Sequence, residues 1–321
     1  MKLLLTGASG FVGGAFLRRF AARDDLTLVG IGRRTNPQLP DSVRYLAHDL
    51  TEPLTLDFRP DVVIHAAALA SPWGTEAEYR RQNIDATRNV IDFCRRNGLP
   101  RLLYVSSSSV LYRNEHQFGL HEDSPIGPDF VNLYAATKYA GEGLVNDYPG
   151  ERSILRPRAV FGPGDTVLFP RILAAARKKR LPRFVGDGPP AIGDLIYIDS
   201  LADYLMRAAT APSLAGAYNL TNAEPVAIEA FLTRILAELG LPLPTRRVSI
   251  GAAMRAAALT EWCYRRLRLA GEPPITRFGV GVFAYSKTFR PDRTIRDFGA
   301  PSVSIEAGVA AFIRWQRQQW T

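Results

Sequence analysis

Short runs of β-branched and aliphatic residues alternate with longer helical runs through the first half of the chain. The longer runs, such as 11–23 and 79–98, favour helices. This alternation predicts an α/β fold, a Rossmann-type doubly wound parallel sheet with helices on both faces. The expected strands are 2–7, 26–32, 43–50, 61–67 and 101–107.

The alternation is lost beyond the segment 152–165. Proline and glycine become more frequent, and an apparent strand at 194–198 then leads into a helix. The last hundred residues indicate helices joined by turns that contain proline. We therefore expect two parts, a Rossmann domain and a smaller, mostly helical C-terminal substrate lobe. The expected boundaries are 1–160 and 191–222 for the domain, and 161–190 and 223–321 for the lobe.

The first predicted strand runs into a glycine-rich turn, "TGASGFVGG", that opens the first helix. Gly7, Gly10 and Gly13 supply a tight turn, a close backbone approach and a helix N-terminus whose free N–H groups favour pyrophosphate. The spacing is G-x-x-G-x-x-G, whereas many dehydrogenases have G-x-G-x-x-G. Its position between an N-terminal strand and a helix distinguishes it from a merely glycine-rich turn. The turn therefore predicts a dinucleotide cofactor.

The second predicted strand ends without the acidic residue with which NAD-selective enzymes accept hydrogen bonds from the ribose. Gly32 stands there, followed by Arg33 and Arg34. Without the carboxylate nothing repels a 2′-phosphate, and an arginine pair can bind it through charge-assisted hydrogen bonds. Arginine is frequent throughout this chain. An arginine pair directly beside the position that lacks the acidic residue nevertheless favours binding of NADP(H) over NAD(H).

Two further strand ends supply expected cofactor contacts. Asp49 follows the third strand, where its carboxylate accepts a hydrogen bond from the adenine amino group or, equally, caps the strand end. Ala66 and Ala67 follow the fourth strand and are small enough for a cofactor to lie on the backbone.

Tyr134 and Lys138 are four residues apart in "NLYAATKYAGEGL" and share one face of a predicted helix. A free phenol has a pKa of about 10, and lowering it by about three units takes roughly 4 kcal/mol of preferential stabilisation of the phenolate. A nearby lysine ammonium in a dry site supplies energy of that order. Most Tyr-x-x-x-Lys pairs are ordinary helix surface, but this one follows the fifth strand, where the sheet offers its ligand crevice.

The fifth strand ends in four consecutive serines, within "YVSSSSVLY" at 104–112. Successive residues of a strand point to opposite faces, so only alternate serines share a side. At the carboxyl end of the strand the chain turns, and one hydroxyl can then point at a substrate oxygen held by Tyr134.

Composition narrows the candidate functions. The net charge is +9, but the basic residues are scattered, so we expect a solvated basic surface and no nucleic-acid partner. Cys94 and Cys263 lie far apart in the sequence and indicate neither a disulfide framework nor a metal site. No apolar run approaches the roughly 18–20 residues that span a bilayer, and the N-terminal run is too short for a signal peptide. We expect a cytoplasmic protein.

The ordered motifs along nearly the whole chain resemble the extended short-chain dehydrogenase/reductase family, the NAD-dependent epimerase/dehydratase type. They are "TGASGFVG", "VVIHAAA", "NIDATRNV", "VSSSSVLY", "YAATK", "LRPRAVFGPGD" and "DLIYIDSLADYL". The resemblance implies a Ser–Tyr–Lys group and hydride transfer between a nicotinamide and a carbonyl or carbinol carbon. Tyr134 exchanges the proton, Lys138 lowers its pKa and holds the nicotinamide ribose, and a serine positions the substrate oxygen.

The family's Ser-Ser-Ser-x-x-Val-Tyr pattern selects Ser108 as that catalytic serine, with Ser107 as the alternative because a one-residue shift in the turn exchanges them. Asn83 matches a family position that supports the cofactor or a proton relay, and packing within its helix is the alternative. The resemblance and the strand ends together imply one set of cofactor contacts. These are Gly7, Ser9, Gly10, Phe11, Val12, Gly13, Arg33, Arg34, Asp49, Leu50, Ala66, Ala67, Ser106, Tyr134, Lys138, Pro157, Ala159 and Val160.

The resemblance also indicates a class of substrate. Nucleotide-sugar members usually carry an Asn just before the Val-x-Gly turn of the sixth strand, and this chain has Ala159 there. The motif "LRPRAVFGPGD" and the C-terminal segment instead resemble the 3β-hydroxysteroid dehydrogenase branch, including its bacterial relatives that reduce 2-alkyl-3-ketoacids. The run 250–271 predicts a helix rich in Ala and Leu that lines an apolar pocket, touches a membrane surface, or packs against its own lobe.

We therefore expect an NADP(H)-dependent oxidoreductase that interconverts a ketone and a secondary alcohol on a hydrophobic substrate, of the 3-hydroxysteroid or β-keto/β-hydroxy acid type. A nucleotide-sugar epimerase or dehydratase is the first alternative. A non-catalytic dinucleotide-binding protein is the second, disfavoured because Ser108, Tyr134 and Lys138 are all present. Homodimers are common in the family that the chain resembles, so a homodimer is one expected assembly.

Overall fold

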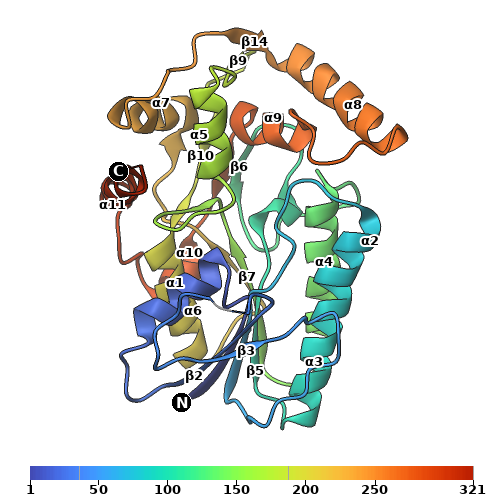
Figure 1. Cartoon of the computed structure of the whole chain (residues 1–321), viewed down its shortest axis with the longest axis vertical. Coiled ribbons are helices and arrows are strands. Elements are labelled where there is room, and N and C mark those ends of the chain that lie inside the picture. Colours follow the sequence, from blue (N-terminus) through green and yellow to red (C-terminus); the bar gives the residue numbers. More distant parts are fainter. Residues whose placement is uncertain (36, 187, 321) are drawn as a thin grey trace.

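A seven-stranded parallel sheet forms the centre of the computed structural model, which describes residues 1–35, 37–186 and 188–320 (Figure 1). The strand order is β12-β7-β5-β4-β1-β2-β3, and every neighbouring pair is parallel. This order confirms the predicted Rossmann-type sheet. Its strands are β1 (Lys2–Thr6), β2 (Thr27–Gly32), β3 (Arg44–Ala47), β4 (Val62–His65), β5 (Arg101–Val105), β7 (Arg152–Pro157) and β12 (Ala217–Leu220).

The five strands predicted in the first half are present, and each is shorter than predicted. The largest difference is in β3, predicted over 43–50, because its neighbour β2 ends at Gly32, which pairs with Ala47. The strand predicted at 194–198 is reduced to β11 (Ile196–Tyr197), which pairs with β8 (Val160–Phe161) outside the main sheet. Ladder length thus depends on the partner strand as well as on the residues themselves.

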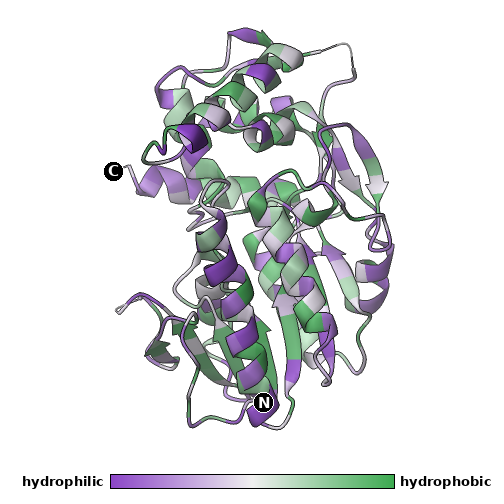
Figure 2. Ribbon diagram, turned by 90° about the vertical axis from the view of Figure 1, so that its right-hand side faces the viewer, coloured by the Kyte–Doolittle hydropathy of each residue, from purple (hydrophilic) through white to green (hydrophobic). Residues whose placement is uncertain are grey.

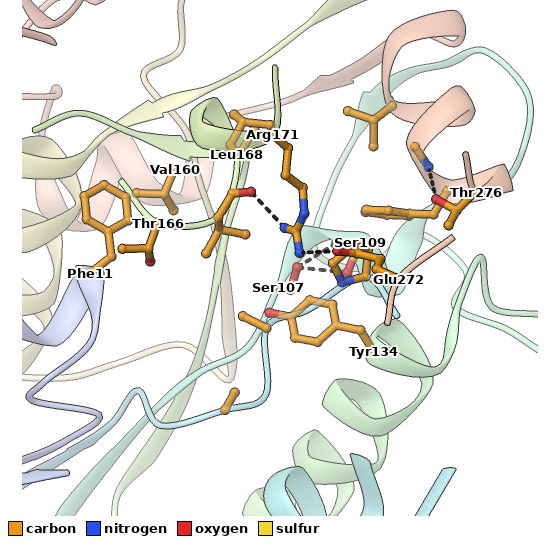
Figure 3. A pocket seen from close by; sticks show the side chains of 18 of the residues that line it. Phe11, Ser107, Ser109, Tyr134, Val160, Thr166, Leu168, Arg171, Glu272 and Thr276 are labelled. Atoms are coloured by element: carbon orange, nitrogen blue, oxygen red, sulfur yellow. Dashed lines mark hydrogen bonds and ion pairs between the residues drawn. The ribbon is translucent and has the colours of Figure 1, made fainter. Parts of the chain in front are cut away.

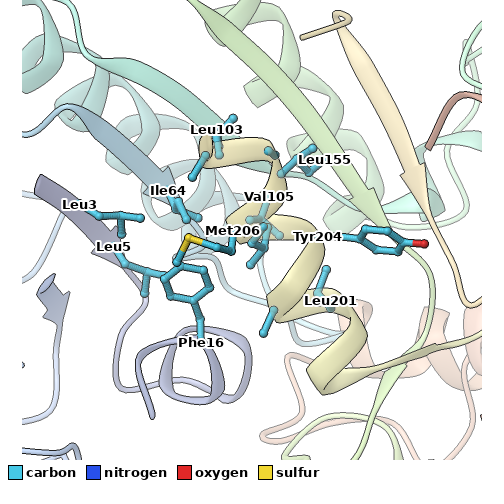
Figure 4. Packing of buried hydrophobic residues seen from close by; sticks show 14 of the residues in the cluster. Leu3, Leu5, Phe16, Ile64, Leu103, Val105, Leu155, Leu201, Tyr204 and Met206 are labelled. Carbon is cyan, nitrogen blue, oxygen red and sulfur yellow. The ribbon is translucent and has the colours of Figure 1, made fainter. Parts of the chain in front are cut away.

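Helices cover both faces of the sheet. On one face the side chains of Leu3, Leu5 and Leu103 meet Phe16 of α1 (Phe11–Phe20) and Leu201 of α6 (Ile198–Thr210) (Figure 4). On the other face, alternate residues of the same strands pack against α3 (Ala86–Arg96) and α4 (Leu133–Asn146). Successive side chains of a strand alternate between faces, so a sheet covered on both sides requires strands that are apolar throughout. The central strands are accordingly mostly hydrophobic (Figure 2).

A second group of helices lies beyond the carboxyl ends of the strands (Figure 1). Helices α5 (Phe169–Arg177), α7 (Ile228–Glu238) and α11 (Ile305–Gln318) share a hydrophobic core of their own. Helices α8 (Ile250–Arg266) and α9 (Arg277–Ala284) pack on each other through Ala253, Ala257 and Val280. None of the helices within the described ranges is long and apolar enough to cross a membrane.

The remaining short elements connect these layers. A four-stranded sheet has the order β13-β10-β15-β6, and β9 pairs with β14. The short elements are α2 (Glu76–Tyr79), the π-helix η1 (Arg80–Asp85), the 3₁₀ helix η2 (Ser108–Leu111), α10 (Asp292–Phe298), β6 (Gln117–Leu120), β9 (Arg183–Val185), β10 (Ile192–Gly193), β13 (Val226–Ala227), β14 (Arg247–Ser249) and β15 (Lys287–Phe289).

Strand β12 of the main sheet falls within 191–222, the second segment expected to belong to the Rossmann domain. The division of the chain into a domain and a lobe remains our proposal.

The glycine turn after β1 packs its backbone against the end of β4 and the start of α1. Gly7 has a φ of +73°, in the left-handed region, and a Cβ there would lie 2.8 Å from the backbone nitrogen of Ala67. A Cβ on Gly13 would lie 2.3 Å from the Gly7 carbonyl oxygen. The backbone atoms at both contacts cannot rotate away as a side chain can, so both positions require glycine.

We expect Gly13→Ala to lower the free energy of unfolding by about 2 kcal/mol or more, because the added methyl must push the turn away from α1. Urea denaturation measures this change. Gly143→Ala is the matched control, since Gly143 is an exposed position of α4 with open space where its Cβ would lie. That control should be neutral or stabilising by about 0.5–1 kcal/mol. Equal effects of the two substitutions would contradict the packing argument.

Candidate active site

One cavity of about 1190 Å³ follows the carboxyl ends of the sheet strands. Its wall includes residues that come directly after β1, β2, β3, β4, β5 and β7, and it extends to α5, α8 and α9. All of the predicted cofactor contacts line it except Lys138. The structure thus brings into one crevice residues that the sequence separates by more than a hundred positions.

The N-terminus of α1 opens the cofactor end of this cavity. Gly10 is the N-cap residue, and the first turn of α1 carries no acidic side chain, so its free N–H groups and helix dipole can meet an anion. A Cβ on Gly32 would lie 2.6 Å from Ser9 Oγ and 2.8 Å from the Tyr45 hydroxyl. A side chain at Gly32, such as the acidic one of an NAD-selective site, would therefore have to displace Ser9 and Tyr45. These residues fit a dinucleotide.

Arg33, Arg34 and Asp49 lie together on the wall at this end of the cavity, and both arginines are exposed. The Tyr45 hydroxyl donates a 2.8 Å hydrogen bond to the Arg34 carbonyl oxygen, which holds the turn after β2. Asp49 Oδ1 accepts a 3.0 Å hydrogen bond from the Thr51 backbone N–H. That bond lowers the pKa of Asp49, and the charge of Arg33 contributes further. Asp49 therefore caps the strand end, as one alternative predicted, while it also lines the cavity.

Tyr134 stands in the first turn of α4 and lines the cavity (Figure 3). The helix begins at this point because Asn132 is its N-cap, with Oδ1 accepting a 2.8 Å hydrogen bond from the Ala135 backbone N–H. Burial raises the pKa of Tyr134 to about 12, against a smaller lowering by the Ser107 hydroxyl. The predicted lowering of this pKa by Lys138 is absent, and burial dominates instead. At neutral pH the phenol carries its proton and can donate it.

Lys138 follows one helical turn later and is buried. Its Nζ lies 4.0 Å from the centre of the Tyr104 ring, a cation–π contact. Burial lowers the pKa of Lys138 to about 7, although the negative charge of Glu142 acts in the opposite direction. Glu142 is itself paired with Arg156 through two hydrogen bonds of 2.9 and 2.7 Å. The ammonium therefore rests on an aromatic face with a buried ion pair one turn away.

The four serines lie beyond the end of strand β5, so the alternation of side chains along a strand does not apply to them. Strand β5 ends at Val105, and Ser107 is the N-cap of η2. Ser108 Oγ lies 2.8 Å from the Tyr112 hydroxyl, and Ser107 Oγ lies 2.9 Å from Ser109 Oγ (Figure 3). The Ser107 hydroxyl is also the one that acts on the Tyr134 phenol, so the geometry favours the alternative, Ser107, over Ser108. Alternation along a strand cannot decide between residues that lie beyond its last ladder pair.

Ser106 and Asn83 both have hydrogen-bond partners within the protein. Ser106 lines the cavity, but its hydroxyl donates a 2.6 Å hydrogen bond to Glu142 Oε1. Asn83 lies in η1 and is not part of the cavity wall. Its Nδ2 donates to Thr137 Oγ1 at 3.0 Å and its Oδ1 accepts from the Leu69 backbone N–H at 2.7 Å. Asn83 thus ties the loop after β4 to the helix that carries Tyr134, and its predicted role in supporting the cofactor or a proton relay stays a prediction.

The sequence did not predict most of the residues that line the cavity opposite its cofactor end. Arg171 of α5 forms a 3.0 Å ion pair with Glu272, close to Tyr134 (Figure 3). The two residues are 101 positions apart, so no local pattern indicates their contact. The run 250–271 forms α8, and Ala252 and Ala256 line the cavity, in agreement with the pocket alternative. Arg158 and Tyr112 also belong to the wall and were not predicted.

Comparison with known proteins shows the family. Residues 3–222 match the NAD dependent epimerase/dehydratase family. The chain belongs to this family. It is 39% identical over 324 residues to the 2-alkyl-3-oxoalkanoate reductase of Stenotrophomonas maltophilia. The alignment covers 96% of this chain and 97% of that relative. It is 26% identical over 337 residues to the decarboxylating sterol-4-alpha-carboxylate 3-dehydrogenase of Schizosaccharomyces pombe, over 98% and 97% of the two chains.

The fold of the family is equally evident in solved structures. The UDP-glucuronic acid 4-epimerase of Bacillus cereus in complex with NAD superposes with a TM-score of 0.73 at 21% identity, over 100% of both chains. These comparisons confirm the predicted extended short-chain dehydrogenase/reductase family, its predicted branch and the predicted NAD(P)-dependent oxidoreductase. The likeness to the epimerase concerns the fold alone.

In this family member we expect Ser107→Ala to lower kcat for carbonyl reduction by about 10²-fold, because the hydroxyl facing Tyr134 is the one placed to hold the reacting oxygen. Ser108→Ala is the matched control and should cost less than about tenfold, since its hydroxyl is bonded to Tyr112. Steady-state kinetics with NADPH measures both variants. A larger loss of kcat in Ser108→Ala than in Ser107→Ala would show that Ser108 positions the substrate oxygen.

Proposed function

We propose that this family member is an NADP(H)-dependent oxidoreductase that interconverts a ketone and a secondary alcohol on a hydrophobic acid of the 2-alkyl-3-oxoalkanoate type. One observation carries the proposal. Tyr134 lies in a single continuous cavity between the glycine turn at one end and an apolar wall from α8 and α9 at the other. The name of the 39% identical relative supports the choice of substrate.

The apolar wall is suited to alkyl chains. Ala252, Ala256, Ile275, Phe278 and Phe283 line it, and aliphatic and aromatic side chains gain free energy by covering hydrocarbon surface. At the end of β7, Ala159 presents a methyl group to the cavity, where the nucleotide-sugar members carry an amide. The wall therefore favours a hydrophobic substrate over a sugar nucleotide.

The proton chemistry follows from Tyr134 and its neighbours. In the direction of reduction, the Tyr134 phenol donates its proton to the carbonyl oxygen, which the Ser107 hydroxyl holds in place. The ammonium of Lys138 stabilises the phenolate that remains. Lys138 Nζ makes no hydrogen bond within the described part of the chain, so its N–H donors remain available for the nicotinamide ribose. A bound nicotinamide supplies the hydride that completes the reduction.

The proposal is tested by following NADPH absorbance with 2-alkyl-3-oxo acids, steroids, aryl ketones and UDP-sugars. We expect oxidation of NADPH with the oxo acids. Tyr134→Phe should lower kcat by about 10²–10⁴-fold while NADPH binding stays nearly unchanged, because the phenol oxygen serves proton transfer. Conversion of a UDP-sugar without net consumption of NADPH, together with inactivity on every ketone, would support the epimerase alternative instead.

The preference for NADP(H) is tested by reversing one charge. We expect Arg33→Asp to raise the Kd for NADPH by roughly 10–100-fold, because a charged hydrogen-bond donor to the 2′-phosphate is replaced by a repelling carboxylate. The Kd for NADH should change little. Arg255→Asp is the control, since Arg255 is exposed on α8 and outside the cavity wall. Equal losses of NADPH and NADH affinity in Arg33→Asp would contradict a 2′-phosphate site.

A further inference from the structure

Arg158 is a buried cation in the cavity wall whose guanidinium forms no ion pair in the part of the chain that the structure describes. It directly follows β7, and only 4% of its surface is exposed. Its backbone N–H donates to the Leu220 carbonyl oxygen at 3.0 Å, which fixes its position against β12. Its Nε has no hydrogen-bond partner, and the guanidinium forms no ion pair within residues 1–35, 37–186 and 188–320. The guanidinium carbon lies 5.2 Å from the centre of the Tyr112 ring.

A buried guanidinium without a partner is unusual, because removing an ion from water costs several kcal/mol unless hydrogen bonds to an opposite charge replace the lost solvation. Arg156, two residues earlier, shows the usual solution. It is buried to a similar degree and forms the paired hydrogen bonds to Glu142. Arg158 lacks such a carboxylate and instead borders an open cavity. Its five N–H donors are therefore suited to an anion that enters the cavity.

The surroundings of Arg158 have an excess of positive charge. Asp194 lies nearby but forms no ion pair with it, and Asp194 Oδ2 is used to accept a 2.8 Å hydrogen bond from the Phe289 backbone N–H. Lys287 is a second buried cation, with its Nζ held at 2.6 Å by the Glu115 carbonyl oxygen. Burial lowers the pKa of Lys287 to about 7, and the charge of Arg158 adds to that effect. Arg158 therefore interacts electrostatically with one carboxylate, that of Asp194, and with one further basic group, Lys287.

The position of Arg158 is at the substrate end of the cavity. Tyr112, whose ring lies against the guanidinium, has its hydroxyl 2.8 Å from Ser108 Oγ. The preceding residue, Ser107, contacts Tyr134. Arg158, Tyr112, Ser107, Ser108 and Tyr134 thus line the same cavity, and Arg158 is linked to Tyr134 through these intervening side chains. The cofactor phosphates are expected elsewhere, at the N-terminus of α1 and at Arg33.

We propose that Arg158 binds the carboxylate of the substrate and so selects β-keto and β-hydroxy acids over neutral ketones and alcohols. The inference rests on the proposed function and adds the residue that recognises the acid group. The carboxylate of such an acid is attached to the carbon next to the reacting centre, so it enters the same cavity that Arg158 and Tyr134 both line. The names of the two relatives reported above, an oxoalkanoate reductase and a sterol-4-alpha-carboxylate 3-dehydrogenase, both describe such a compound.

The test uses the oxidative direction, because a β-hydroxy acid is stable whereas a β-keto acid loses its carboxylate spontaneously. NADP⁺ reduction is measured with a 2-alkyl-3-hydroxyalkanoic acid and with its methyl ester. The wild type should prefer the acid. Arg158→Gln should lower kcat/KM for the acid by roughly 10–100-fold, the loss of a charge-assisted bidentate contact, and change that for the ester by less than about threefold. Arg158→Lys should restore part of the preference.

Binding measurements separate this proposal from the proposed function. A 2-alkylalkanoic acid, which has the carboxylate and both chains but no reacting oxygen, should raise the Tm of the wild type and leave that of Arg158→Gln unchanged. If neither the hydroxy acid nor its ester is oxidised while the wild type still shows this Tm shift, the proposed reaction is wrong and the anion site stands. A preserved preference for the acid or a preserved Tm shift in Arg158→Gln would overturn the role of Arg158.

Two further variants identify other roles of the arginines. Arg171→Gln removes the other cavity arginine, which already has Glu272 as its partner. If the preference for the acid disappears in Arg171→Gln and persists in Arg158→Gln, Arg171 is the carboxylate site. If Arg158→Gln instead raises the Kd for NADPH tenfold or more, Arg158 belongs to the cofactor site and the proposal fails.

Discussion

At the carboxyl ends of β1 and β4 the backbones of Gly7 and Ala66–Ala67 meet without a side chain between them, and the rest of the site depends on this contact. It brings the N-terminus of α1 against the point where the strand order of the sheet reverses, which is where an open parallel sheet offers its crevice. Gly13 and Gly32 extend the same arrangement toward α1 and β2. At the cofactor end the backbone segments pack closely, so the space available for a Cβ determines which residues fit at these glycine positions.

The catalytic end is built differently, from buried polar groups. Burial moves the pKa of Tyr134 upward and that of Lys138 downward to about 7, so at neutral pH the phenol is protonated and a substantial fraction of Lys138 is still an ammonium. His65, at the end of β4, is also held neutral, with its pKa lowered to about 3. A protonated phenol is the form that reduction of a ketone requires. This end therefore suits a reductase without further charge rearrangement of Tyr134.

Two arginines of one short segment show how the fold assigns different roles to the same residue type. Arg156 lies in β7 and turns toward α4, where Glu142 neutralises it. Arg158 lies just beyond the strand and borders the cavity, where no carboxylate reaches it among the described residues. Local sequence does not separate them, since both belong to the run "LRPRAVFGPGD". The difference comes from which distant element each one faces.

The sequence by itself determined the parallel sheet, the glycine turn, and the placement of Tyr134 and Lys138 one turn apart on a helix. These features depend on residue periodicity, on glycine conformation and on helical spacing, all of which act between near neighbours in the chain. Tertiary structure decided which serine meets Tyr134, because β5 ends at Val105 and the alternation of a strand stops there. It also decided that Ser106 bonds Glu142, that Arg171 pairs with Glu272, and that the Arg158 guanidinium has no ion pair among the described residues. Each of these depends on which remote residue is brought within a few ångströms, which no local pattern records.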